Sequence, residues 1–107
     1  MNEAQIQKAV FEHLKKRGVP GVIAWHVPNG PEARRRVGYR AGVPDVTIVT
    51  PTETFFLELK RAKGKASAEQ LAVVSEINRG KPGRAYIADG LDDAIVWMEL
   101  QGILRGQ

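Results

Sequence analysis

The stretch GVPDVTIVTPTETFFLELKRAKGKASAEQ, residues 42–70, decides the fold and holds most of the candidate chemistry. It contains two apolar runs rich in β-branched and aromatic residues, 45–50 and 54–60, separated by Pro-Thr-Glu. Runs of this kind around a short turn predict a β-hairpin. A basic Gly-Lys link follows, and Ser67 then predicts the start of a helix.

Side chains of the second run divide between the two faces of the predicted sheet, because successive residues of a strand alternate. One face receives Phe55, Leu57 and Leu59, and the other receives Phe56, Glu58 and Lys60. Two charges on a solvated sheet face would be ordinary. Asp45 favours a different interpretation, because the hairpin can bring its carboxylate close to Glu58 and Lys60.

Two neighbouring carboxylates repel each other and are best explained by a shared cation. The chain has no cysteine, and His13 and His26 lack the spacing of zinc ligands. Hard oxygen ligands indicate Mg²⁺ or Mn²⁺. A metal beside the Lys60 ammonium group is an arrangement for phosphoryl transfer, in which Lys60 would orient or deprotonate the attacking water.

The rest of the chain predicts an α/β fold in the order α-β-β-β-α-β-α, with a mixed sheet flanked by helices. We expect a helix over 3–17 with Asn2 as its N-cap, a strand over 22–27 and a long connection over 28–44. The second helix should run from Ser67 to about Arg79, with Leu71 and Val74 facing inward. A short strand over 84–88 and a last helix from Asp92 to about Leu104 complete the chain. The unit over 54–88 predicts a parallel crossover.

Length and charge suit a single domain, residues 1–107, that binds a polyanion. The net charge is +4, and residues 1–84 hold 15 Lys and Arg against 8 Asp and Glu. No apolar run approaches the roughly 18 residues of a membrane span. The N-terminus lacks the form of a signal peptide, so we expect a cytoplasmic protein without membrane contact.

These motifs together resemble the VRR-NUC domain of the PD-(D/E)xK nuclease superfamily, over residues 3 to about 99. The features that carry the resemblance are Pro28-Asn29-Gly30 before an arginine-rich loop, Gly42-Val43-Pro44-Asp45, Glu58-Leu59-Lys60, and Ser67 with Gln70. The resemblance implies a restriction-endonuclease-like core. It also implies a metal-dependent endodeoxyribonuclease that acts on branched DNA as a homodimer, similar to Holliday-junction resolvases in a bacterial cell or a phage-infected host.

The resemblance also implies roles for individual residues. Asp45, Glu58 and the backbone carbonyl of Leu59 would ligate the metal, and Lys60 would be the general base or position the water. Gln70 and Glu3 would assist at the edge of the site. With a nuclease site nearby, DNA contacts are expected from basic residues of the two connections: Arg34, Arg35, Arg36, Arg40, Lys63 and Lys65.

The auxiliary residues also have structural interpretations. Ser67 and Gln70 have the spacing of a capping box. Glu3 suits a helix N-terminus through the dipole alone. Asn29 is expected as a turn residue, and Trp25 and Trp97 are expected in the core.

Three functions remain open from the sequence. The first is the structure-selective endonuclease. The second is a nuclease fold that binds branched DNA without cutting it, and the third is a sequence-specific restriction endonuclease. The absence of a helix-turn-helix or zinc-finger pattern favours recognition by shape and charge over base reading.

Overall fold

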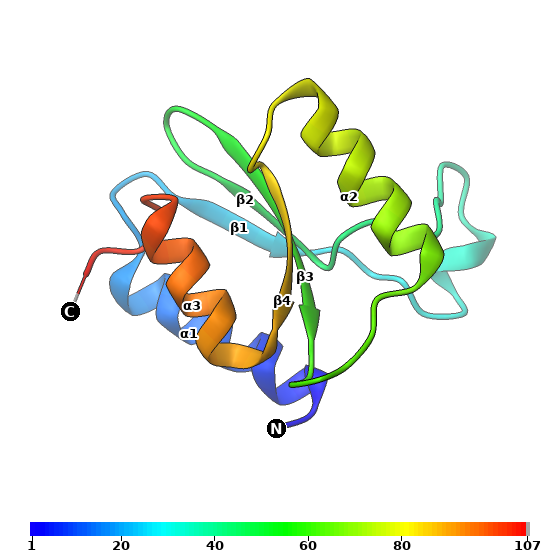
Figure 1. Ribbon diagram of the computed structural model, residues 1–107, viewed down its shortest axis with the longest axis horizontal. Coiled ribbons are helices and arrows are strands. Elements are labelled where there is room, and N and C mark those ends of the chain that lie inside the picture. The colour runs from blue at the N-terminus through cyan, green and yellow to red at the C-terminus, as the bar shows by residue number, and fades with distance from the viewer. Residues whose placement is uncertain (107) are drawn as a thin grey trace.

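The computed structural model describes residues 1–106, in which three α-helices and four strands follow the predicted order (Figure 1). In chain order the elements are α1 (Glu3–Arg17), β1 (Ile23–His26), the 3-10 turn η1 (Ala33–Arg35), β2 (Val46–Val49), β3 (Thr54–Lys60), α2 (Ala68–Gly80), β4 (Ala85–Asp89) and α3 (Gly90–Leu100). Between residues 1 and 106, no helix has the length and apolar character needed to cross a membrane.

Helix α1 forms as its sequence predicts. The Asn2 side chain accepts a hydrogen bond from the backbone N–H of Gln5, and the Gln5 side chain accepts one from the Asn2 N–H. This capping box satisfies two of the N–H groups that a helix start leaves free. Ile6, Val10 and Leu14 form the buried stripe, which fixes the face that α1 turns toward the sheet.

The four strands make one mixed sheet in the order β1-β2-β3-β4. β1 pairs with β2 and β2 pairs with β3 in antiparallel fashion, which confirms the hairpin. β3 pairs with β4 in parallel, as expected for the crossover through α2. The pairing of β2 with β3 stops at Val46 opposite Leu57, whereas β3 continues beside β4 as far as Lys60.

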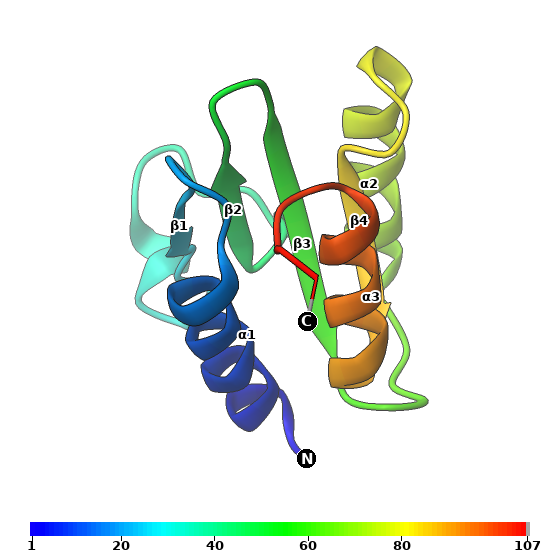
Figure 2. The same ribbon diagram turned by 90° about the vertical axis from the view of Figure 1, so that its left-hand side faces the viewer.

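Helices cover the two faces of the sheet unequally (Figures 1 and 2). α1 and α3 lie side by side on one face and form the main core with its buried side chains, which include Phe55, Leu57 and Leu59. α2 lies on the opposite face, over the β3 and β4 half of the sheet. Glu58 points to this second face and is 1% exposed, so the face is not the solvated surface that two charges would suggest.

Three expectations about burial and helix ends are wrong. Trp25 is 47% exposed, because β1 is the edge strand and α2 does not extend over it, whereas Trp97 is buried. Leu71 is 56% exposed, and Val73 is the buried residue of α2. α3 begins at Gly90 and not after Asp92.

The start and end of α3 have local causes. Its first turn forms early because the carboxylate of Asp93 accepts the N–H of Asp89 at 2.8 Å. It ends at Leu100, short of Leu104, because Gly102 adopts a φ of 73°. That left-handed conformation closes a helix at little steric cost for glycine.

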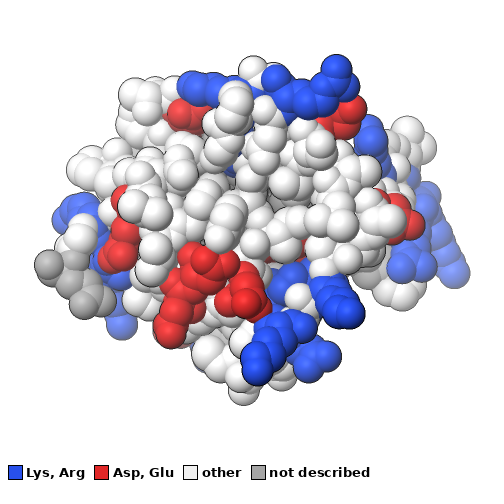
Figure 3. All heavy atoms as spheres, viewed as in Figure 1, with Lys and Arg blue, Asp and Glu red and all other residues white. Residues whose placement is uncertain are grey.

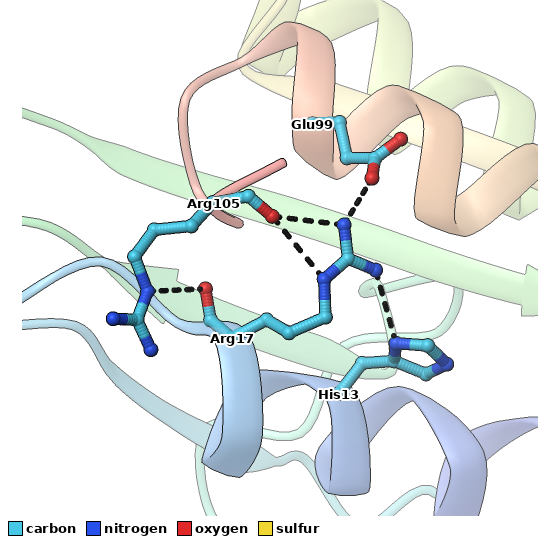
Figure 4. Close-up of polar contacts among 4 residues, drawn as sticks. All are labelled: His13, Arg17, Glu99 and Arg105. Atoms are coloured by element: carbon cyan, nitrogen blue, oxygen red, sulfur yellow. Dashed lines mark hydrogen bonds and ion pairs between the residues drawn. The ribbon is translucent and has the colours of Figure 1, made fainter. Parts of the chain in front are cut away.

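Arg17 joins the C-terminal ends of α1 and α3 (Figure 4). Its guanidinium forms an ion pair with Glu99, and Nη2 donates to the carbonyl of Arg105 at 2.8 Å. The N–H of Arg105 returns a hydrogen bond to the carbonyl of Arg17 at 2.8 Å. His13 also contacts this guanidinium, at 3.2 Å, and so lies in a structural contact at the end of α1.

Candidate active site

Asp45 lies just before β2, where the sheet opens between β2 and β3. Its Oδ2 accepts the backbone N–H of Leu59 at 2.9 Å. A side-chain hydrogen bond therefore joins Asp45 to β3 just beyond the last backbone-paired residues of β2 and β3. Its own carbonyl accepts the N–H of Val27 at 2.7 Å, which ties the same residue to the end of β1. Asp45 is therefore held from both sides, with its carboxylate toward β3.

Glu58 is a buried carboxylate on β3, covered by α2. Its Oε2 accepts a hydrogen bond from the Gln70 side-chain amide at 3.0 Å and lies 3.7 Å from the Lys60 Nζ. Its Oε1 is buried and has no hydrogen-bond partner among residues 1–106. The pKa of Glu58 is raised to about 8, chiefly by burial and then by the negative charge of Asp45, while the positive charge of Lys60 opposes the shift.

The donor set suits a divalent cation with oxygen ligands. A buried carboxylate oxygen without a partner is costly, and a second carboxylate nearby increases the cost. A cation between Asp45 and Glu58 removes both penalties. No cluster of three or more His, Cys, Asp or Glu side chains suited to a metal occurs within residues 1–106. Mg²⁺ does not require one, because it is commonly held by one or two carboxylates and keeps several waters.

Gln70 caps the start of α2 and also contacts the Glu58 carboxylate. Its Oε1 accepts the N–H of Ser67 at 2.9 Å, and the Ser67 hydroxyl accepts the N–H of Gln70 at 3.1 Å. This capping box fixes which way the amide points, so the NH₂ group faces Glu58. Helix capping thus sets the orientation of a side chain that touches the buried carboxylate.

Glu3 lies farther from the centre. It occupies the first position of α1 and is exposed. Its negative charge contributes to the raised pKa of Glu58, which places it within electrostatic range of the site. The structure shows no direct contact between the two side chains among the hydrogen bonds of residues 1–106.

The basic residues expected to bind DNA are exposed on two connections. Lys and Arg side chains gather along one edge of the surface, where Figure 1 shows the β1–β2 connection, and again near the β3–α2 connection (Figure 3). The exposed members are Arg34, Arg35, Arg36 and Arg40 on the first connection and Lys63 and Lys65 on the second. We call residues 28–44 the arginine loop.

A hollow of about 390 Å³ separates the arginine loop from the start of α2. Arg34 and Tyr39 line it from the loop, and Ser67 and Gln70 line it from the helix. Asn29 also borders it. Gln70 therefore borders the hollow beside the arginine loop and also contacts the buried carboxylate of Glu58.

Two residues gain a contact with the site that the sequence did not predict. The Asn29 side-chain amide lies 3.4 Å from the Asp45 Oδ1, a long contact that the Pro-Asn-Gly turn positions. Gly42 packs against the backbone of α2, so that a Cβ there would lie 2.4 Å from the Glu69 carbonyl oxygen. The available signal in the sequence was the glycine before Val-Pro-Asp, which suggests a left-handed turn position, and Gly42 does adopt a φ of 88°.

Comparison with known proteins supports the fold. The chain matches no protein-family model and no curated protein by sequence. A solved structure described as a VRR_NUC domain protein superposes with a TM-score of 0.74 at 21% identity. The match covers 94% of this chain and 90% of the other. The chain therefore has the fold of a VRR-NUC domain, a mixed sheet flanked by helices, as the motifs in its sequence predicted.

Proposed function

We propose that this chain is a Mg²⁺- or Mn²⁺-dependent DNA endonuclease that hydrolyses phosphodiester bonds and prefers branched DNA. The observation that carries the proposal is the Glu58 carboxylate, 1% exposed, with one oxygen unpartnered and Lys60 and Asp45 beside it. Buried charge of this kind is expensive to maintain, and a catalytic cation is the interpretation that explains all three side chains.

Three groups of the chain would hold the cation: the carboxylates of Asp45 and Glu58 and the backbone carbonyl of Leu59. In a strand, the N–H and C=O of one residue point to the same neighbour. Since the Leu59 N–H donates to Asp45, its carbonyl faces the same side, beyond the last β2 pair. When bound, the cation would polarise the scissile phosphate and lower the pKa of a coordinated water.

Lys60 and Gln70 would act on the attacking water and on the phosphate. The Lys60 ammonium lies 3.7 Å from Glu58 and is mostly buried, so it is held rigidly beside the carboxylates. There it can orient the water and stabilise the negative charge that grows on the phosphate oxygens. The Gln70 amide, fixed by its capping box, would hold the Glu58 carboxylate in place.

DNA would approach over the exposed arginines of the arginine loop, with Lys63 and Lys65 on the other connection. Recognition would depend on shape and charge, because phosphate contacts carry no sequence information. One site makes one nick, so paired nicks across a junction would require a homodimer with twofold symmetry. A sequence-specific restriction endonuclease would instead cut linear duplex at one defined sequence.

A panel of DNA substrates tests the proposal. Linear duplex, flap, splayed-arm and four-way-junction DNA are incubated with Mg²⁺ or Mn²⁺, with Asp45→Asn as the inactive control. We expect metal-dependent cleavage of the branched substrates that Asp45→Asn abolishes. Unchanged cleavage in Glu58→Gln and Lys60→Ala would show that these side chains are not catalytic.

A non-catalytic DNA-binding module is the second candidate. It is favoured by the engagement of both Asp45 oxygens within the chain, one with Leu59 and one with Asn29. In that case the protein binds branched DNA with similar affinity in EDTA and in Mg²⁺ and nicks none of the panel.

A further inference from the structure

Trp25 is an exposed aromatic side chain on the edge strand β1, with 47% of its surface accessible. It lies directly opposite Thr47 on β2, and Thr47 lies opposite Phe56 on β3. Directly opposed residues of antiparallel strands share a face. Trp25 is therefore on the face that carries Glu58, on the half that α2 leaves open.

The Trp25 ring has no aromatic neighbour among residues 1–106, and no hydrogen bond to its indole is found there. Trp97 differs in its burial and in its aromatic neighbours. It is 6% exposed, stacks on Tyr86 with ring centroids 5.3 Å apart and meets Phe55 edge-on at 5.8 Å. One tryptophan thus belongs to the core, and the other is about half exposed on the edge strand.

The chain runs from Trp25 directly to the basic surface. Val27, two residues on, lines a hollow of about 260 Å³ together with Arg36, Tyr39 and Arg40. Asn29 borders the same hollow and contacts Asp45. The exposed Trp25 ring is therefore followed within a few residues of chain by the arginine-lined hollow and by Asn29, which contacts Asp45.

We propose that Trp25 is a stacking platform for an unpaired base of the DNA strand that the arginine loop binds. Surfaces that hold single strands combine basic residues, which track the phosphates, with aromatic rings, on which bases stack. A base in a duplex is already stacked on both sides, so the platform selects DNA with unpaired bases. This inference rests on the proposed function in one respect, that DNA is the ligand of this face.

The arrangement of charge favours DNA over a second copy of the chain as the occupant. The residues opposite Trp25 and next in line across the sheet are Thr47 and Phe56, so no carboxylate stands directly across from Trp25 in the strand register. Glu53, toward the β2–β3 turn, is neutralised by Lys81 at 2.7 Å. The exposed arginines on the continuing chain supply the positive charge that a nucleic acid strand requires.

Tryptophan emission tests the platform without any need for catalysis. The full chain in EDTA is titrated with splayed-arm DNA and with fully paired duplex of equal length. Splayed-arm DNA should quench the emission of Trp25, while buried Trp97 provides the unchanged background. Trp25→Ala should weaken binding of splayed-arm DNA by at least about fivefold, the lower end of the cost of losing one base stack, and change duplex binding less than twofold.

Two matched variants separate stacking from general effects. Trp25→Phe retains a ring and should bind splayed-arm DNA within about twofold of wild type, with the quenching signal gone. Leu100→Ala removes another exposed apolar side chain, 78% accessible and on α3, and should change neither signal nor affinity.

Three results would overturn the platform: no quenching of wild type by splayed-arm DNA, equal losses for both DNAs in Trp25→Ala, or a dimer in sedimentation that Trp25→Ala converts to monomer. The last result would make this face an interface between two copies. The metal-dependent cleavage panel is scored separately. Normal cleavage together with any of these results rejects the platform alone, and preserved quenching without cleavage rejects the nuclease alone.

Discussion

The Asp45 carboxylate accepts the backbone N–H of Leu59 at 2.9 Å and so links the two strands where their pairing ends. Asp45→Asn retains an oxygen that can accept this hydrogen bond but removes the charge. We expect it to unfold in urea near the wild-type midpoint and to lose metal-dependent cleavage. Asp45→Ala leaves the N–H unsatisfied and should cost about 1–3 kcal/mol of stability. Equal stability of the two variants would contradict this role for Asp45.

Glu58→Gln should separate the effect of the buried acidic group on stability from its role in binding Mg²⁺. In EDTA near neutral pH, wild type must take up a proton on Glu58 as it folds, because the pKa of this buried group is raised to about 8. The neutral Gln avoids that cost, so the melting temperature of the variant should equal or exceed that of wild type. Added Mg²⁺ should raise the melting temperature of wild type and leave the variant unchanged, since a ligand stabilises only the state that binds it. Glu76→Gln, on the exposed surface of α2, is the control and should respond to Mg²⁺ like wild type.

Substitutions at Gly42 and Gly38 form a matched pair that tests the contact between the arginine loop and α2. Both have positive φ, 88° and 85°. A Cβ at Gly38 meets nothing within 4 Å, whereas one at Gly42 would lie 2.4 Å from the Glu69 carbonyl oxygen. Gly38→Ala should therefore cost only the left-handed strain, about 1–2 kcal/mol, and Gly42→Ala distinctly more. Urea unfolding measures both, and equal losses would mean that the loop moves away freely.

Replacement of Arg34, Arg35 and Arg36 by Ala should weaken DNA binding and reduce its dependence on salt. Each lost phosphate contact lowers the slope of log K against log salt by about 0.7–0.9. The control removes the same charge from α1, through Lys8, Lys15 and Lys16, all exposed and on the layer opposite α2. Filter binding at several salt concentrations should show a smaller slope for the arginine variant alone. Matching slopes in the two triple variants would place the arginines outside the interface.

Tyr86 makes the stability of the folded chain depend on pH in the alkaline range. Its hydroxyl donates to Asp93 at 2.8 Å, and this hydrogen bond, together with burial, raises the pKa of Tyr86 above its usual value of 10.0. The unfolded chain then loses this proton first, so stability is full below about pH 10 and falls as pH rises toward the folded pKa. Urea unfolding between pH 9 and 11 should show a steeper loss for wild type than for Tyr86→Phe. Tyr39→Phe keeps Tyr86 and should lose stability like wild type.

Local sequence patterns correctly predicted those helices and strands whose bounds depend only on nearby residues. The bounds of α1 follow from Asn2, its apolar stripe and Gly18, and those of β3 from the turn before it and the basic link after it. The proximity of Asp45, Glu58 and Lys60 was also predictable, because Asp45 directly precedes β2, and a short turn joins β2 to the strand that carries the other two. The catalytic use of these residues and of Gln70, Glu3 and Leu59 stays a prediction.

The misplaced residues depended on packing between distant segments. Trp25 was expected in the core because a β-prone sequence does not reveal whether its strand lies at an edge or under a helix. The exposure of Leu71 depends on the rotation of α2 about its axis, which its contacts with β4 decide. The burial of Glu58 follows from the same packing, since α2 crosses over the second face of the sheet.

The early end of β2 has a consequence for how this site can be dissected. Beyond the pair of Val46 and Leu57, β2 and β3 are no longer paired, although β3 continues beside β4. The main chain of β3 at Leu59 therefore borders the opening between the two strands. A cation seated there would draw part of its affinity from a peptide oxygen that every amino acid carries. A complete alanine scan would leave that ligand intact and would assign the whole affinity to the carboxylates. Ester replacement of the peptide bond after Leu59, which weakens its carbonyl as an electron donor, reaches the ligand that side-chain replacement cannot.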